Sequence, residues 1–108
     1  MAVTTATINL VMAGTNGAAT GEALSSIPVN GVVRGVHVAY PDGANVATEV
    51  KLESLRPTQL LIDETGNTSG WVYPETAGGQ LLAVDEMLKA TGGAGNAGTV
   101  VITVLLEV

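Results

Sequence analysis

The segment VATEVKLESL, residues 46–55, alternates apolar or uncharged side chains with charged ones more regularly than any other part of the chain. One face of an extended strand would carry Val46, Thr48, Val50 and Leu52, and the other would carry Glu49, Lys51 and Glu53. A period of two is typical of a strand that buries one face and exposes the other. The segment therefore predicts an antiparallel sheet that is covered on one side only.

The same period recurs on both sides of this segment, and clusters of Gly, Asn, Asp and Pro separate the repeats. Strands are predicted over residues 3–12, 22–29, 32–40, 46–55, 58–63, 70–73, 81–84, 87–91 and 99–108. Residues 64–69 are predicted as a turn, and a helical turn over residues 81–89 is an alternative to strands there. Within 32–40, Val32, Val36, Val38 and Tyr40 are expected to share a face with Arg34.

These elements predict a single-domain antiparallel β-sandwich or jelly roll of about 7–9 short strands, with a barrel as the alternative. Residues 1–108 form this one domain, because 108 residues support only one core. The first seven residues either begin the first strand or extend as an N-terminal arm. The glycine-rich stretches 14–21 and 92–98 are predicted as loops, and GAGNAG at 93–98 lacks the helix that a dinucleotide-binding turn requires.

Composition and charge narrow the possible partners. Ten acidic against four basic residues give a net charge of −6, which disfavours nucleic acid as a partner. The apolar run at 100–106 is far shorter than the ~20 residues that cross a bilayer, so no membrane partner is expected. The N-terminus lacks the basic residues of a secretory signal and is interpreted as mature sequence. Only 13% of residues are charged, against a usual share of about 25%, and this apolar surplus indicates association.

Few side chains could perform chemistry, and no catalytic, cofactor-binding or metal-ligating residue is predicted. The chain has no cysteine, and its single histidine, His37, lies in a valine-rich strand, where it is expected to face solvent or a subunit contact. Asp63 and Glu64 are adjacent, so a strand would direct them to opposite faces. We therefore expect a protein that is not an enzyme.

Three groups of residues are candidates for an interface. The first is the second face of the last strand, Val101, Thr103 and Leu105, because a sandwich covers only one face of each sheet. The second is Ala2, Val3 and Thr5 in an uncharged N-terminal strand that could add to a neighbour's sheet edge. The third is the pair Trp71 and Tyr73, two apart on one strand, which anchor a core or a protein interface or else form a platform for a sugar ring.

The succession IPVNGVVRGVHVAYPDG, VATEVKLES, SGWVYPE and MLKATGGAGNAGTVVITVLLEV resembles the small β-sandwich proteins that decorate or cement the capsids of tailed bacteriophages. This resemblance implies a non-enzymatic virion protein that forms homo-oligomers, most often trimers, and stabilises the shell. It further implies the major capsid protein as partner, assembly in the host cytoplasm and a place on the outer capsid surface. The alternatives are a carbohydrate- or receptor-binding module of a head fibre and a subunit of another assembly such as a tail tube.

Overall fold

The computed structural model describes residues 3–25, 29–41, 46–55, 58–73 and 83–107. These residues form nine strands, and no helix occurs among them. The strands are β1 (Val3–Met12), β2 (Ala19–Leu24), β3 (Val29–Ala39), β4 (Thr48–Leu55), β5 (Thr58–Gly66), β6 (Gly70–Val72), β7 (Ala83–Glu86), β8 (Leu88–Gly95) and β9 (Gly98–Glu107). The predicted all-β fold is confirmed.

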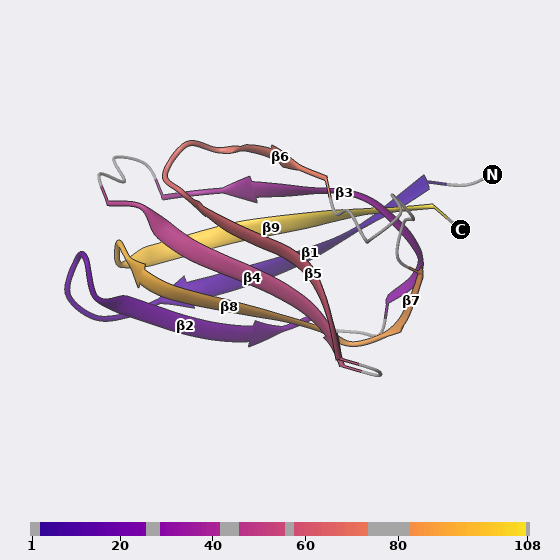
Figure 1. The fold of residues 1–108 in the computed structure, drawn as a ribbon, viewed down its shortest axis with the longest axis horizontal. Helices are drawn as coiled ribbons and strands as arrows, with labels where there is room; N and C mark the ends of the chain where they lie inside the picture. Colours follow the sequence, from indigo (N-terminus) through magenta and orange to yellow (C-terminus); the bar gives the residue numbers. More distant parts are fainter. Residues whose placement is uncertain (1–2, 26–28, 42–45, 56–57, 74–82, 108) are drawn as a thin grey trace.

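Two antiparallel sheets pack face to face as a sandwich (Figure 1). The first, sheet A, has the order β1-β9-β3-β6, and β7 also pairs with β3. The second, sheet B, has the order β2-β8-β4-β5. The chain therefore passes between the sheets at several turns, among them the turn from β5 to β6 and the short turn from β8 to β9.

The core between the sheets is built from the apolar face of each alternating strand. In β4, Thr48, Val50 and Leu52 are buried as predicted, and in β9 the buried residues are Val100, Ile102, Val104 and Leu106. β9 is an inner strand, paired with β1 on one side and β3 on the other. The second face of β9 thus lies in the middle of the outer surface of sheet A.

A β-bulge in β3 makes the predicted face of that strand wrong for Val32 and Arg34, whereas Val36, Val38 and Tyr40 share a buried face as predicted. The register with β9 shifts between Val33 and Gly35, so the extra residue, Arg34, is exposed. The buried residues are therefore Val33, Val36, Val38 and Tyr40, and Val32 does not share their face. A bulge inserts one residue without a partner and reverses the alternation beyond it, which sequence periodicity does not reveal.

Several predicted boundaries are also wrong. β5 continues to Gly66 through part of the predicted turn. Residues 83–86 and 88–95 form β7 and β8, so the two strands predicted there are confirmed over the alternative helical turn, although their bounds differ. Of the two predicted glycine loops, the first ends where β2 begins at Ala19, and the second is occupied by β8 as far as Gly95. Glycines enter β8 because core side chains lie against it: a Cβ on Gly92 would lie 3.0 Å from Met12 Cε.

Candidate functional site

The outer faces of the two sheets differ in charge. On sheet B the middle and edge strands present carboxylates and ammonium groups, namely Glu22, Glu49, Lys51, Glu53, Asp63 and Lys89. Two ion pairs form on this face, from Lys51 to Glu49 and from Lys89 to Glu22, each at 3.6 Å. The outer surface of sheet B is therefore typical of a sheet face that is exposed to solvent.

The outer face of sheet A, which we call the A face, carries Thr, Val and aromatic side chains instead. Register aligns Thr5 on β1 with Leu105 on β9 and Gly35 on β3, and the next row aligns Thr7, Thr103 and His37. Charge is confined to one end of the face, where the Arg34 guanidinium donates to the Glu107 carboxylate. These two charges compensate each other, so the A face is close to neutral over β1, β9, β6 and residues 32–39 of β3. β7, which contains Asp85 and Glu86, pairs with residues 29–32 of β3 at the end of the sheet.

Two exposed aromatic residues form a ridge on this face. Trp71 is 48% exposed and Tyr73 65% exposed, so the interpretation of this pair as a core anchor is wrong. Both rings lie over Gly35, where a Cβ would be 3.3 Å from Trp71 Cε3 and 3.4 Å from Tyr73 Cε1. His37, opposite Trp71 in the register, meets the indole edge-on with ring centroids 5.2 Å apart and an interplanar angle of 72°. Glycine at position 35 thus lets the ridge lie close to the sheet.

The structure brings most of the predicted interface residues together on the A face. Val101, Thr103 and Leu105 are half-buried in its centre, Val3 and Thr5 are exposed at its β1 edge, and Trp71 and Tyr73 lie near its β6 edge. Residues 3–7, considered above as an arm, pair with β9 in β1, and Ala2 lies outside the described residues. Sequence periodicity did not identify Val11 and Gly35 as residues of the A face. A single exposed valine at the end of a strand does not by itself indicate an interface.

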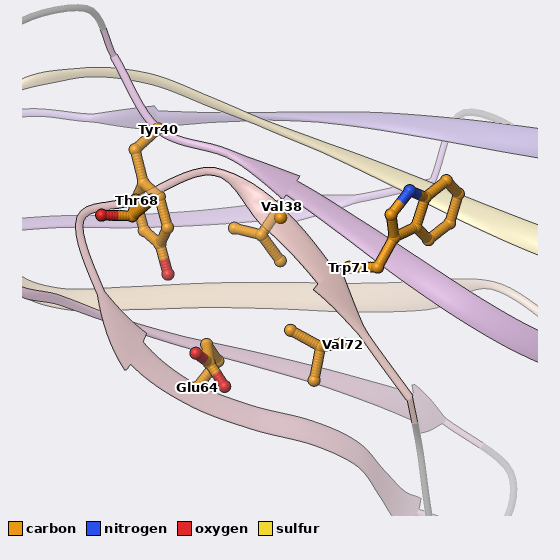
Figure 2. Close-up of a pocket in the computed structure, with 7 residues that line it drawn as sticks. Val38, Tyr40, Glu64, Thr68, Trp71 and Val72 are labelled. Atoms are coloured by element: carbon orange, nitrogen blue, oxygen red, sulfur yellow. The ribbon is translucent and has the colours of Figure 1, made fainter.

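A second feature is a cavity of about 140 Å³ at the open edge of the sandwich between β5 and β6 (Figure 2). It is lined by Val38, Tyr40, Glu64, Thr68, Gly70, Trp71 and Val72. The Trp71 ring points away from it, whereas the Tyr40 hydroxyl points toward Glu64. Burial, and next the negative charge of Glu64, raise the pKa of Tyr40 above its ordinary value of 10.0.

The described part of the chain holds neither a metal-binding cluster nor a membrane-spanning helix. No group of three or more His, Cys, Asp or Glu side chains is placed to hold a metal ion there. Among the same residues there is no helix of the length and apolarity needed to span a membrane.

Comparisons with known proteins identify a fold but no family. No family model matches the chain, and the search of curated proteins finds no relative. Among solved structures, the crystal structure of FLHE is similar over 100% of both chains, with a TM-score of 0.57 and 18% sequence identity. At this identity the likeness establishes the β-sandwich fold alone.

The FLHE match overturns the predicted virion role, because a solved structure that is similar along the whole chain is not that of a capsid decoration protein. It likewise supports neither a head-fibre module nor a tail-tube subunit. The patterns quoted for the resemblance, alternating strands separated by Pro and Gly turns, are shared by β-sandwiches in general. These patterns identify the fold correctly but do not indicate a function, because function depends on particular surface residues.

Proposed function

We propose that the protein is a non-enzymatic interaction domain that pairs with a second copy of itself through the A face. The observation that carries this proposal is the contrast between the two outer faces. Sheet B exposes four carboxylates, two ammonium groups and, on its two edge strands, Leu24 and Leu60. The A face exposes two aromatic rings and valine, with one compensated ion pair. Specific interfaces are depleted of charge at their centre and enriched in Trp and Tyr.

Charge selects the face through which two copies can meet. Each chain carries −6, so two copies repel each other, and the repulsion is weakest where they meet through the face with the fewest charges. Pairing through the A face places the near-neutral surfaces together and leaves the carboxylates of sheet B on the two outer sides of the dimer.

The shape of the face is self-complementary. The ridge of Trp71 and Tyr73 rises beside β3, whereas the opposite edge carries the short side chains of Thr5 and Thr7 on β1. A two-fold axis in the interface that runs along the strands brings the ridge of one copy onto the β1 edge of the other. This is an isologous contact, in which one patch serves both partners.

The size of the A face is close to that of a specific interface. β1, β9 and β3 are ten or eleven residues long. Strands of this length, spaced ~4.8 Å apart, give a footprint of about 500 Å² before the aromatic ridge is added. A specific complex buries roughly 800 Å² per partner, so the A face with its ridge approaches a complete interface.

Light scattering coupled to size-exclusion chromatography tests the proposal with two matched variants. Leu105→Glu places a carboxylate in the centre of the A face, and Leu60→Glu places one on the outer side of sheet B, where Leu60 is 52% exposed. The wild type and Leu60→Glu are expected to be dimers at micromolar concentration. Leu105→Glu is expected to weaken the dimer by about 3 kcal/mol, because the charge is buried without a partner. A monomeric wild type, or a Leu105→Glu dimer of unchanged affinity, contradicts the proposal.

A further inference from the structure

The cavity between β5 and β6 contains two polar groups that the fold leaves without a hydrogen-bond or ion-pair partner among the described residues. Tyr40 is only 8% exposed, and its hydroxyl is buried with no hydrogen-bond partner. Buried hydroxyls are nearly always paired, because desolvating one without compensation is costly. The ring is aimed into the cavity from the end of β3 (Figure 2).

Glu64 is the second of these groups. It lies opposite Val50, which is buried, so its half-buried side chain points to the inner side of β5, while Asp63 beside it is exposed. The basic side chains of the described residues pair elsewhere: Arg34 with Glu107, Lys51 with Glu49 and Lys89 with Glu22. A half-buried carboxylate is best stabilised by a cation, and none of these three cations reaches it.

The two groups face a common point. A Cβ placed on Gly66 would lie 3.7 Å from the Tyr40 hydroxyl oxygen and 3.8 Å from Glu64 Oε1. Both oxygens therefore border the same end of the cavity, beside Gly66. The turn that follows Gly66 is tied to the end of β3 by the backbone N–H of Tyr40, which donates to Ser69 Oγ at 3.0 Å. The polar end of the cavity is thus fixed by the fold before any ligand arrives.

The remaining walls are formed by Val38, Val72 and Trp71, together with Gly70 and the polar Thr68. Val38 and Val72 face the cavity beside Glu64, and Gly70 keeps the β6 side open, since a Cβ there would contact nothing within 4 Å (Figure 2). The volume of about 140 Å³ is close to that of a cavity that accepts a small organic molecule. The site thus combines a carboxylate and a hydroxyl at one end with space for a short hydrocarbon stem.

We propose that this cavity binds an aliphatic ammonium group, with the nitrogen between Glu64 and Tyr40 and the hydrocarbon stem against Val38 and Val72. An ammonium donates three hydrogen bonds, and both the carboxylate and the phenol oxygen accept them. Burial and the charge of Glu64 raise the pKa of Tyr40, so the phenol stays protonated at neutral pH. The ammonium comes either from a small free amine or from the lysine side chain of a partner protein.

Binding is measured by titrating isotope-labelled protein with n-butylammonium and following the methyl resonances of Val38 and Val72. A saturable shift with a dissociation constant on the order of 1 mM is expected for so small a ligand. Uncharged 1-butanol, of the same length, is expected to bind at least about tenfold more weakly, because it lacks the charge-assisted bond to Glu64. Equal binding of the two probes, or no saturation by about 50 mM, overturns the proposal.

Adjacent carboxylates supply the matched variants. Glu64→Gln is expected to weaken butylammonium binding at least about tenfold, and Tyr40→Phe to weaken it by a smaller factor. Asp63→Asn removes a charge from the exposed side of the same strand, and its dissociation constant is expected to stay within about twofold of the wild type. Gly66→Ala, whose methyl group would lie in ordinary contact with both oxygens, is expected to narrow the space beside them and weaken binding. If Glu64→Gln binds butylammonium like the wild type, the proposed site is contradicted. If Glu64→Gln does not fold, butylammonium binding by Tyr40→Phe tests the site instead.

A third probe, Nα-acetyl-lysine methylamide, distinguishes a lysine side chain from a free amine as the source of the ammonium group. Binding at least as tight as that of butylammonium identifies a lysine side chain, and binding of butylammonium alone identifies a free amine; either result supports the site. The cavity lies on the inner side of β6 and the A face on its outer side. Loss of amine binding and loss of dimerisation are therefore distinguishable outcomes.

Discussion

The imidazole of His37 lies edge-on to the indole of Trp71, with ring centroids 5.2 Å apart. In the strand register, Thr103 on β9 lies beside His37 on β3, on the side away from Trp71. Thr103, His37 and Trp71 therefore form one row across sheet A. The edge-to-face geometry favours contact between the positive edge of one ring and the negative face of the other. Trp71 is thereby held on the A face while almost half of its surface remains exposed.

Thiol cross-linking reports directly on which faces meet, because the chain contains no cysteine of its own. Thr103→Cys places a thiol on the A face, and Thr91→Cys places one on an inner strand of sheet B, where the threonine is likewise half-buried. A short bismaleimide is expected to join Thr103→Cys into a covalent dimer and to leave Thr91→Cys monomeric on a denaturing gel. The reverse pattern would mean that copies meet through sheet B.

Gly35→Ala is expected to lift the aromatic ridge without unfolding the sandwich. The added methyl group would lie 3.3 Å from Trp71 Cε3, so the exposed rings must shift by a few tenths of an ångström. Tryptophan fluorescence should change, and the dimer should weaken by about 1 kcal/mol, since shape complementarity at the interface is reduced. Gly70→Ala is the control, because a Cβ there meets nothing within 4 Å. Unchanged fluorescence and affinity for Gly35→Ala would show that the ridge does not depend on this close approach.

Gly95→Ala is expected to destabilise the fold by about 2 kcal/mol, as overpacking does in a rigid core. Its Cβ would lie 2.6 Å from Thr48 Cγ2, and Thr48 is itself 1% exposed and unable to move away. Gly93, two residues earlier on the same strand, has nothing within 4 Å of its Cβ position. Urea denaturation should therefore find Gly93→Ala close to the wild type. Equal midpoints for the two variants would contradict the packing at the end of β8.

Tyr40→Phe is expected to raise the free energy of unfolding by about 1 kcal/mol, because it removes a buried hydroxyl that has no partner. The variant also predicts a difference in pH dependence. Burial and Glu64 raise the pKa of Tyr40 in the folded state, so above pH 10.0 the unfolded chain loses this proton while the folded chain keeps it. Wild-type stability should fall as the pH rises from 10 toward the folded-state pKa.

Thermal unfolding of the two proteins at pH 8 and pH 11 measures this difference. The gap in melting temperature between Tyr40→Phe and the wild type should be wider at pH 11, since only the wild type carries the shifted phenol. A gap of constant size would show that Tyr40 ionises at its ordinary pKa in the folded protein.

The sequence by itself determined the strands whose alternation is unbroken. β1 has the predicted bounds Val3–Met12, and the buried and exposed faces of β4 and β9 are those that the period of two assigns. It also determined that Asp63 and Glu64 point to opposite sides, because neighbouring side chains on a strand must do so.

Only the tertiary structure decided where these faces lie relative to one another. The bulge at Arg34, the strand order and the crossing from β5 to β6 depend on pairing between residues far apart in the chain, and local periodicity contains no information about such pairing. That pairing placed Trp71, His37, Leu105 and Thr5 on one neutral face and turned Tyr40 and Glu64 toward a common cavity. Periodicity indicated most residues of the A face, whereas the cavity and the proximity of Tyr40 to Glu64 arise only from the sandwich.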